Sequence, residues 1–188
     1  MLVLETIKNR RSVRSFESKS ITAEDLLEIL TAGTWAPFYG SGEPWHFIKV
    51  GAQTRAKISE HYSQYMEAGP LKSPDFPEER KAFVREFVKD FGNAAELIVV
   101  KHSAPQSPLD EHDFPLASAA AVQNILLAAW EKGIASVWLS IGVIPGVRQE
   151  LQLAEKEDIA GVIALGYAKQ VPPAQARTPV TERLIELP

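Results

Sequence analysis

Apolar positions recur along this chain at two kinds of spacing, which together predict helices alternating with short strands. Spacings of three and four residues predict helices over Leu2–Asn9, from Thr22 to about Ala32, over Gln53–Glu67, around Phe83–Phe91, from about Phe114 to Lys132, and near Gly146–Leu153. Short apolar runs predict buried strands at Trp45–Val50, Glu96–His102, Ile134–Leu139 and Ile159–Gly166. We therefore expect one domain, residues 1–188, with a central sheet of four or five strands and helices on both faces.

Turn residues divide these elements. Thr22, with Asp25 three residues later, is a predicted N-cap, and Gly33 stands where a helix would end. The segment 69–77 holds three of the thirteen prolines and is a candidate surface lid. From Gln170 onward four prolines predict an extended arm, which we expect to pack against a partner subunit.

Composition excludes several classes of protein. The chain has no cysteine, which excludes disulfides, thiolate nucleophiles and zinc–thiolate sites. The net charge of -4 argues against a nucleic-acid partner. No apolar run approaches the ~20 residues of a membrane-spanning helix, and the N-terminus is not a signal peptide. The expected compartment is the cytoplasm, with no membrane partner.

Familiar catalytic motifs are missing. The sequence has no P-loop, no GxGxxG fingerprint, no GxSxG elbow and no HExxH zinc motif. The run Asp110–Asp113 is a weak candidate for a hard cation and is better interpreted as a solvated helix start. His46 lies in an apolar strand, where a structural histidine is the more common outcome.

A basic cluster stands out against the acidic chain. Lys8, Arg10, Arg11 and Arg14 face only Glu5 within the first fourteen residues. Such a cluster is either a solvated helix end or an anion site, since guanidinium groups match phosphate geometry. The cluster alone leaves both interpretations open.

Four segments in a fixed order carry a resemblance to a known family. They are RRSVR at 10–14, APFYGSGEPWHF at 36–47, QNILLAA with GIASVW within 123–138, and LGY near 165–167 followed by Arg177. Together they resemble the nitroreductase family of flavin enzymes over essentially the whole chain. The resemblance implies an α+β fold, with a mixed or antiparallel sheet of four to five strands flanked by helices. It also implies a homodimer with FMN at the subunit interface and an extended C-terminal arm.

The resemblance also implies a set of FMN-binding residues. Arg10, Arg11, Ser12 and Arg14 match the motif that holds the phosphate and the polar edge of the flavin, and Arg177 matches a late basic residue at the phosphate. Pro37, Tyr39 and Ser41 match positions through which the partner subunit touches the flavin. The main chain of Trp138, Leu139 and Ser140 is expected to pass the reactive N5 atom. No catalytic side chain and no metal are implied.

This chain departs from the family pattern in the second motif. Ser41 stands in place of the usual Asn, Glu43 in place of Gln, and Phe38 and Tyr39 in place of small residues. The aromatic pair is expected to narrow the pocket and to favour flat substrates by stacking.

The implied function is an FMN-dependent oxidoreductase. It takes hydride from NADH or NADPH and reduces flat, electron-poor small molecules such as nitroaromatics and quinones by a ping-pong mechanism. The motifs do not distinguish the two donors. The alternatives are a specialised flavin enzyme of the same fold, dehalogenase-like or flavin-consuming, and a non-catalytic flavin carrier.

Overall fold

A four-stranded antiparallel sheet forms the centre of the computed structural model, which describes residues 2–40 and 42–187. The strands are β1 (Trp45–Lys49), β2 (Glu96–His102), β3 (Ala135–Leu139) and β4 (Asp158–Gly166), in the order β1-β2-β4-β3. The α-helices are α1 (Val3–Asn9), α2 (Ala23–Thr34), α3 (Ala52–Ala68), α4 (Glu78–Asp90), α5 (Pro108–Glu131) and α6 (Pro145–Glu150). Short 3-10 turns occupy η1 (Pro70–Lys72), η2 (Ile141–Val143) and η3 (Val180–Glu182). The expected α+β fold is confirmed.

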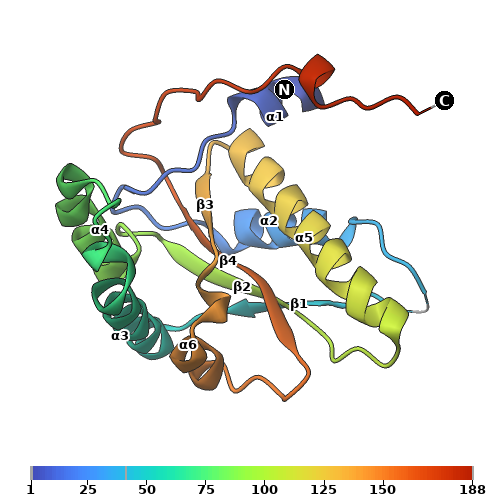
Figure 1. The fold of residues 1–188 in the computed structure, drawn as a ribbon, viewed down its shortest axis with the longest axis horizontal. Helices are drawn as coiled ribbons and strands as arrows, with labels where there is room; N and C mark the ends of the chain where they lie inside the picture. The colour runs from blue at the N-terminus through green and yellow to red at the C-terminus, as the bar shows by residue number, and fades with distance from the viewer. Residues whose placement is uncertain (1, 41, 188) are drawn as a thin grey trace.

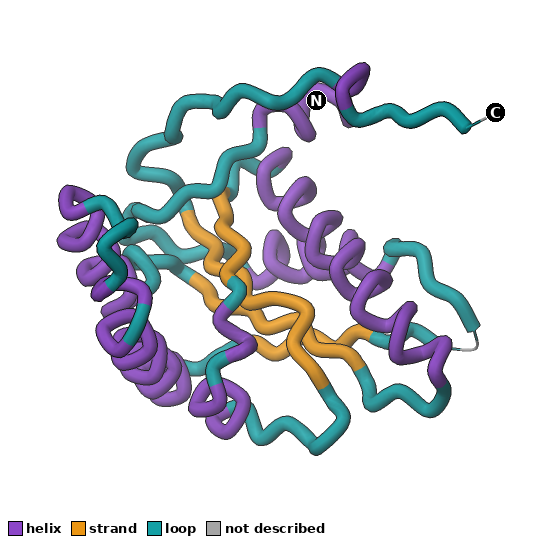
Figure 2. Tube along the Cα trace, viewed as in Figure 1, coloured by secondary structure: helices purple, strands orange, loops and turns teal. Residues whose placement is uncertain are grey.

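Helices cover both faces of the sheet (Figures 1 and 2). Successive side chains of a strand point to opposite faces, and β2 divides its apolar residues accordingly. Leu97 and Val99 belong to a core shared with α3, α4 and α6, whereas Ile98 and Val100 belong to a second core shared with α2 and α5. The two-sided burial explains why β2 and β4 read as continuous apolar runs in the sequence.

Two helix boundaries differ from the sequence expectation. Helix α5 starts at Pro108 rather than near Phe114, because the Ser107 side chain caps it by accepting a hydrogen bond from the Asp110 backbone N–H. Gly33 does not end α2, which continues to Thr34. A β-carbon at Gly33 would lie 2.9 Å from Cγ1 of Ile125 on α5, so this glycine permits close packing of the two helices.

The segment that follows α1 runs along the free edge of β3. Ser12 forms a parallel bridge with Ser136, and Phe16 forms an antiparallel bridge with Ala168 after β4. The backbone N–H of Val13 donates to Ser136 O at 3.0 Å. These few bonds place the basic cluster beside the ends of β3 and β4.

The C-terminal arm is largely extended and exposed after Gln170, apart from η3. Figure 1 shows it returning from β4 to pass beside α1. Its apolar side chains and those of α1 remain exposed: Leu2, Val3, Leu4, Ile7, Val171, Val180, Leu184, Ile185 and Leu187. Among the described residues, none of the helices is long and apolar enough to span a bilayer.

Candidate functional site

A pocket of about 450 Å³ opens between the end of α1, the segment 10–14 and the C-terminal arm. Its lining contains five cationic side chains from both ends of the chain, and no carboxylate among the described residues: Lys8, Arg10, Arg11, Arg14 and Arg177. Ile7, Ser12, Pro172, Pro173, Ala174 and Gln175 complete the wall. The pocket thus unites the basic cluster with the distant Arg177, as the sequence predicted.

Arg10 is the innermost of these cations. Its Nη1 atom is buried and has no hydrogen-bond partner within the described structure. Burial, together with the charges of Arg11 and Arg177, lowers the pKa of the Arg10 guanidinium from its usual value. A buried donor without a partner is costly, which indicates that an anionic ligand completes this arrangement.

The neighbouring arginines are held by main-chain carbonyls. Arg11 Nη1 donates to Lys8 O at 2.7 Å and to Arg10 O at 2.9 Å, at the end of α1. Arg14 Nη1 reaches Ser12 O at 3.5 Å. Over residues 2–40 and 42–187, the structure records no ion pair for any of the five cations. Their charge is therefore available to a ligand.

The start of β3 lies beside the segment 10–14 through the bridge between Ser12 and Ser136, and residues 138–140 follow at the other end of the strand. Trp138 is partly exposed, and a β-carbon at Gly161 would lie 2.2 Å from Trp138 Nε1, so the indole lies directly over this glycine. Leu139 is buried in the core, and Ser140 is exposed. Within the part of the chain that the structure describes, the Ser136 hydroxyl is buried without a hydrogen-bond partner, which the sequence analysis missed because a serine in an apolar strand carries no local sign of this.

Comparison with known proteins identifies the family of this chain. Residues 7–167 match the nitroreductase family, which is most of the chain. The chain belongs to the nitroreductase family. Membership of this family makes it an oxidoreductase, as the resemblance in the sequence predicted.

Relatives and solved structures agree with this assignment. YfhC of Bacillus subtilis, which carries the name of an NAD(P)H nitroreductase, is 28% identical over 97% of this chain and 93% of its own. A nitrobenzene nitroreductase of Ectopseudomonas oleovorans is 24% identical over 87% of this chain and 86% of its own. The nitroreductase-like protein of Bacillus cereus has a TM-score of 0.80 at 29% identity and covers 100% of this chain and 96% of its own. A nitroreductase of Bacteroides fragilis with bound FMN has a TM-score of 0.70 at 30% identity, with 100% of both chains covered.

The second motif of this nitroreductase lies apart from the cationic pocket within one chain. Pro37 and Tyr39 are exposed on the loop that follows α2 and do not line the pocket, and Ser41 falls outside the described residues. Phe38 packs edge-on against Trp45, with ring centroids 5.6 Å apart. Trp45 is buried and belongs to the core shared with α2 and α5.

The other candidates have structural roles. Among the described residues no group of three or more His, Asp or Glu side chains is placed to hold a metal, and the run 110–113 lies inside α5. His46 Nε2 and the Ser103 hydroxyl form a hydrogen bond of 2.9 Å on the surface. In the candidate lid, Leu71 of η1 is buried, so this part of the segment is anchored to the body.

Proposed function

We propose that this chain is a single-domain, FMN-dependent oxidoreductase that takes electrons from NADH or NADPH and reduces flat, electron-poor acceptors such as nitroaromatics and quinones. The observation that carries the proposal is the cationic pocket, in which the buried Arg10 Nη1 has no partner. A phosphate monoester, with a charge near -2 and several acceptor oxygens, fits a donor set of this kind. The FMN-bound relative and the nitrobenzene-reducing relative support the choice of cofactor and acceptor.

In this proposal, Arg10 and Arg177 hold the FMN phosphate from opposite ends of the chain. Arg11, Ser12 and Arg14 bind the phosphate and the polar edge of the flavin. The main chain of 138–140, at the end of β3, lies beside the reactive edge. Cationic groups near the ring stabilise the negative charge that reduction adds.

When bound, FMN supplies the chemistry, because it accepts a hydride from the donor and returns reducing equivalents to the acceptor. The protein binds and orients. Since the sequence holds no separate dinucleotide-binding fingerprint, we propose that donor and acceptor use one open site in turn, which is a ping-pong scheme. No side-chain nucleophile is required, and protons come from solvent.

We propose further that the functional unit is a homodimer. The exposed apolar side chains of α1 and of the arm support an interface, since monomers rarely expose a contiguous apolar surface of this kind. In such a dimer, Pro37 and Tyr39 of one subunit approach the pocket of the other, as the family resemblance implies for Ser41 as well. This arrangement accounts for the separation of Pro37 and Tyr39 from the cationic pocket within a single chain.

The test is an absorbance spectrum of the purified protein before and after anaerobic addition of NADH or NADPH. We expect the bands of oxidised flavin, and we expect them to bleach on addition of either donor. Bands that persist would indicate a flavin carrier or another electron donor. A colourless protein that does not bind added FMN would overturn the proposal.

A further inference from the structure

A second pocket, of about 300 Å³, opens on the other side of the segment that carries Arg14. Its lining comes from that segment, from α4 and the turn after it, and from the start of the arm: Arg14, Ser15, Phe83, Glu86, Phe87, Lys89, Asp90, Gly92, Asn93 and Lys169. Arg14 is the one described residue that lines both pockets. A ligand in the second pocket is therefore a close neighbour of a ligand in the first.

One wall of the second pocket is a fixed aromatic surface. The Phe83 side chain is 46% exposed, and its ring lies nearly parallel to that of Phe87, with centroids 6.5 Å apart and an interplanar angle of 13°. Phe87 is buried and meets Phe91 edge-on at 6.4 Å. The Phe83 ring is thus exposed to solvent, and its packing against Phe87 holds its orientation. This arrangement suits the stacking of a flat ligand.

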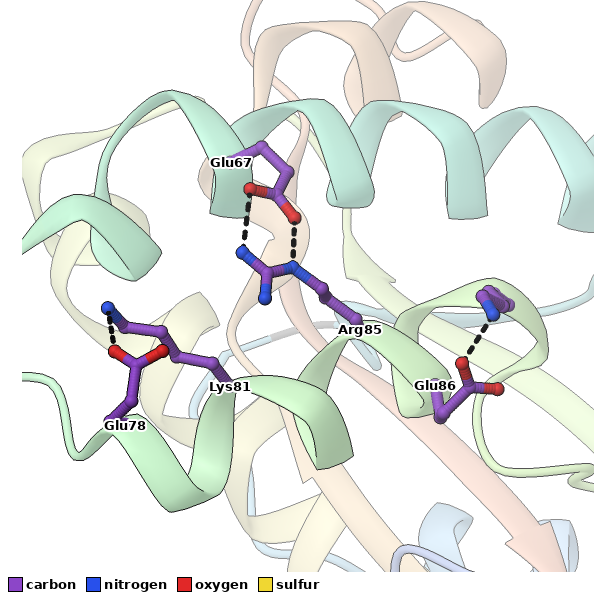
Figure 3. Close-up of polar contacts among 6 residues, drawn as sticks. Glu67, Glu78, Lys81, Arg85 and Glu86 are labelled. Atoms are coloured by element: carbon purple, nitrogen blue, oxygen red, sulfur yellow. Dashed lines mark hydrogen bonds and ion pairs between the residues drawn. The ribbon is translucent and has the colours of Figure 1, made fainter.

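The rim around this ring carries charges of both signs. Glu86 pairs with Lys89 on α4, and the Asp90 carboxylate accepts a hydrogen bond from the Asn93 backbone N–H at 3.0 Å (Figure 3 shows Glu86). The backbone N–H of Lys169 donates to Ser15 O at 3.0 Å, which brings this side chain beside the segment of Arg14. In the described structure, neither Lys169 nor Arg14 has a carboxylate partner.

The pocket is also rigidly built. Phe91, Gly92 and Asn93 have consecutive φ angles of 59°, 68° and 64°, a left-handed turn that two non-glycine residues adopt only at a cost. A β-carbon at Gly92 would lie 2.3 Å from Arg14 O, so the turn packs directly against the backbone of Arg14. Arg55 holds the turn by donating to Ala94 O at 2.7 Å and to Asp90 O. The turn after α4 and the backbone of Arg14 are consequently fixed relative to one another.

We propose that this second pocket binds the adenylate half of NADH or NADPH. Phe83 stacks on the adenine base, the cations Arg14 and Lys169 face the phosphates, and the carboxylates of Glu86 and Asp90 accept hydrogen bonds from the exocyclic amine. A volume of about 300 Å³ lies at the small end of ligand sites, which suits half of a dinucleotide rather than the whole. The inference rests on the proposed function, because the nicotinamide half must reach a flavin held beside Arg14.

Binding of ADP-ribose to the FMN-loaded protein tests this inference without catalysis. Isothermal titration calorimetry compares the wild type with Phe83→Ala and Phe83→Tyr, and with Tyr65→Ala as a matched control. Tyr65 is an aromatic residue on α3, 45% exposed, that lines neither pocket. We expect Phe83→Ala to weaken binding by about tenfold, since stacking on a base is worth about 1–3 kcal/mol. Phe83→Tyr retains the ring and should stay near wild type, as should Tyr65→Ala.

Lys169→Gln provides a second variant that does not touch the core, because this side chain is exposed. It should weaken ADP-ribose binding by several-fold and leave the fold intact by circular dichroism. ADP-ribose that binds Phe83→Ala and Lys169→Gln as tightly as wild type would overturn the inference.

A truncated donor separates this inference from the proposed function. Reduced nicotinamide mononucleotide has no adenylate, so Phe83→Ala should lower kcat/KM for NADH about tenfold and change that for the truncated donor less than twofold. An equal loss with both donors would place Phe83 against the flavin or the nicotinamide and would overturn the inference. Failure of both donors to reduce the wild-type flavin would instead contradict the proposed function, whereas ADP-ribose binding would still report on the pocket.

Discussion

The cations of this molecule differ in their surroundings, and two populations can be compared. Outside the pocket, eight basic side chains of the described residues form ion pairs, although others such as Arg55 and Arg80 form none: Lys49–Glu96, Lys57–Glu150, Lys81–Glu78, Arg85–Glu67, Lys89–Glu86, Lys101–Glu157, Lys132–Asp25, Lys132–Glu28 and Arg148–Asp158. Around the cationic pocket, the described structure gives none of the five cations such a partner. The gathering of five unpaired cations in one pocket, with no carboxylate among its described lining residues, supports the proposed anion site.

The difference also concerns stability. Paired surface ions contribute little free energy, whereas clustered like charges repel and destabilise the folded state. In the proposed function, a bound anion would restore the stability that repulsion among the pocket cations costs the apoprotein. Substitutions of the pocket cations and substitutions of the paired ions should therefore have opposite consequences for FMN binding and for the stability of the fold.

The largest effect is expected from removing Arg10 and Arg177, the two cations proposed to hold the FMN phosphate. Arg10→Ala combined with Arg177→Ala should weaken FMN binding at least about a hundredfold, because each charge-assisted hydrogen bond is worth about 1.5–3 kcal/mol. The fold should persist. Fluorescence titration with FMN measures the affinity, and Lys49→Ala with Lys57→Ala is the control drawn from the paired cations. A double mutant that purifies with full flavin occupancy would show that the phosphate assignment is wrong.

Truncation of the arm should also affect the pocket cations and leave the paired cations unchanged. Deleting residues 171–188 removes Arg177 and one wall of the pocket, and it should convert a dimer to a monomer in sedimentation while lowering FMN occupancy. Deleting only 179–188 leaves the pocket residues Pro172, Pro173, Ala174, Gln175 and Arg177 in place. Its FMN affinity should stay closer to wild type. Unchanged sedimentation of the longer deletion would contradict the intersubunit role of the arm.

A smaller effect is expected from giving the unpaired cations a carboxylate. Gln175→Glu places a negative charge in the pocket wall without changing the size of the side chain. FMN binding should weaken by about tenfold, the value of one charge-assisted contact, while the melting temperature of the apoprotein rises. Gln53→Glu, on an exposed position of α3, is the matched control. Equal affinities of the two variants would argue that no anion binds beside Gln175.

The smallest effect is expected on thermal stability at low pH, where the carboxylates of the ion pairs become protonated. Lys101 and the Ala154 backbone N–H hold the pKa of Glu157 below its usual value. The stabilising contribution of this carboxylate is complete above the unfolded-state pKa of about 4.3 and is lost as the pH falls through the lower folded-state value. Glu157→Gln should therefore reduce thermal stability slightly at pH 7 and not at all below the folded-state pKa. A mutant deficit that grows as the pH falls would contradict this account.

The sequence predicted the helices and strands well wherever burial imposes a period. It failed locally at Gly33 and Phe114, because packing of α2 against α5 and capping by Ser107 override the propensity of single residues. The bridge between Ser12 and Ser136 has no periodic signal, since only isolated backbone contacts form it. The left-handed Asn93 and the buried hydroxyl of Ser136 depend on contacts with distant segments, which no local pattern records.

The candidate site residues could be predicted only in part. The basic cluster and Arg177 were proposed from the order of the family motifs, and the structure brings them into one pocket. The second pocket was not foreseen, because Phe83 appeared only as one member of an amphipathic stripe. Its partial exposure depends on where α4 ends against the segment of Arg14.

The cationic pocket is built from the first and last parts of the chain, with the whole sheet between them in sequence. During synthesis the N-terminal half of this pocket leaves the ribosome long before Arg177 does. The strands and their helices can assemble while the pocket is still open on one side. Capture of the cofactor is therefore expected only after Arg177 has left the ribosome, so a nascent chain that stalls between β4 and Arg177 would be folded and colourless.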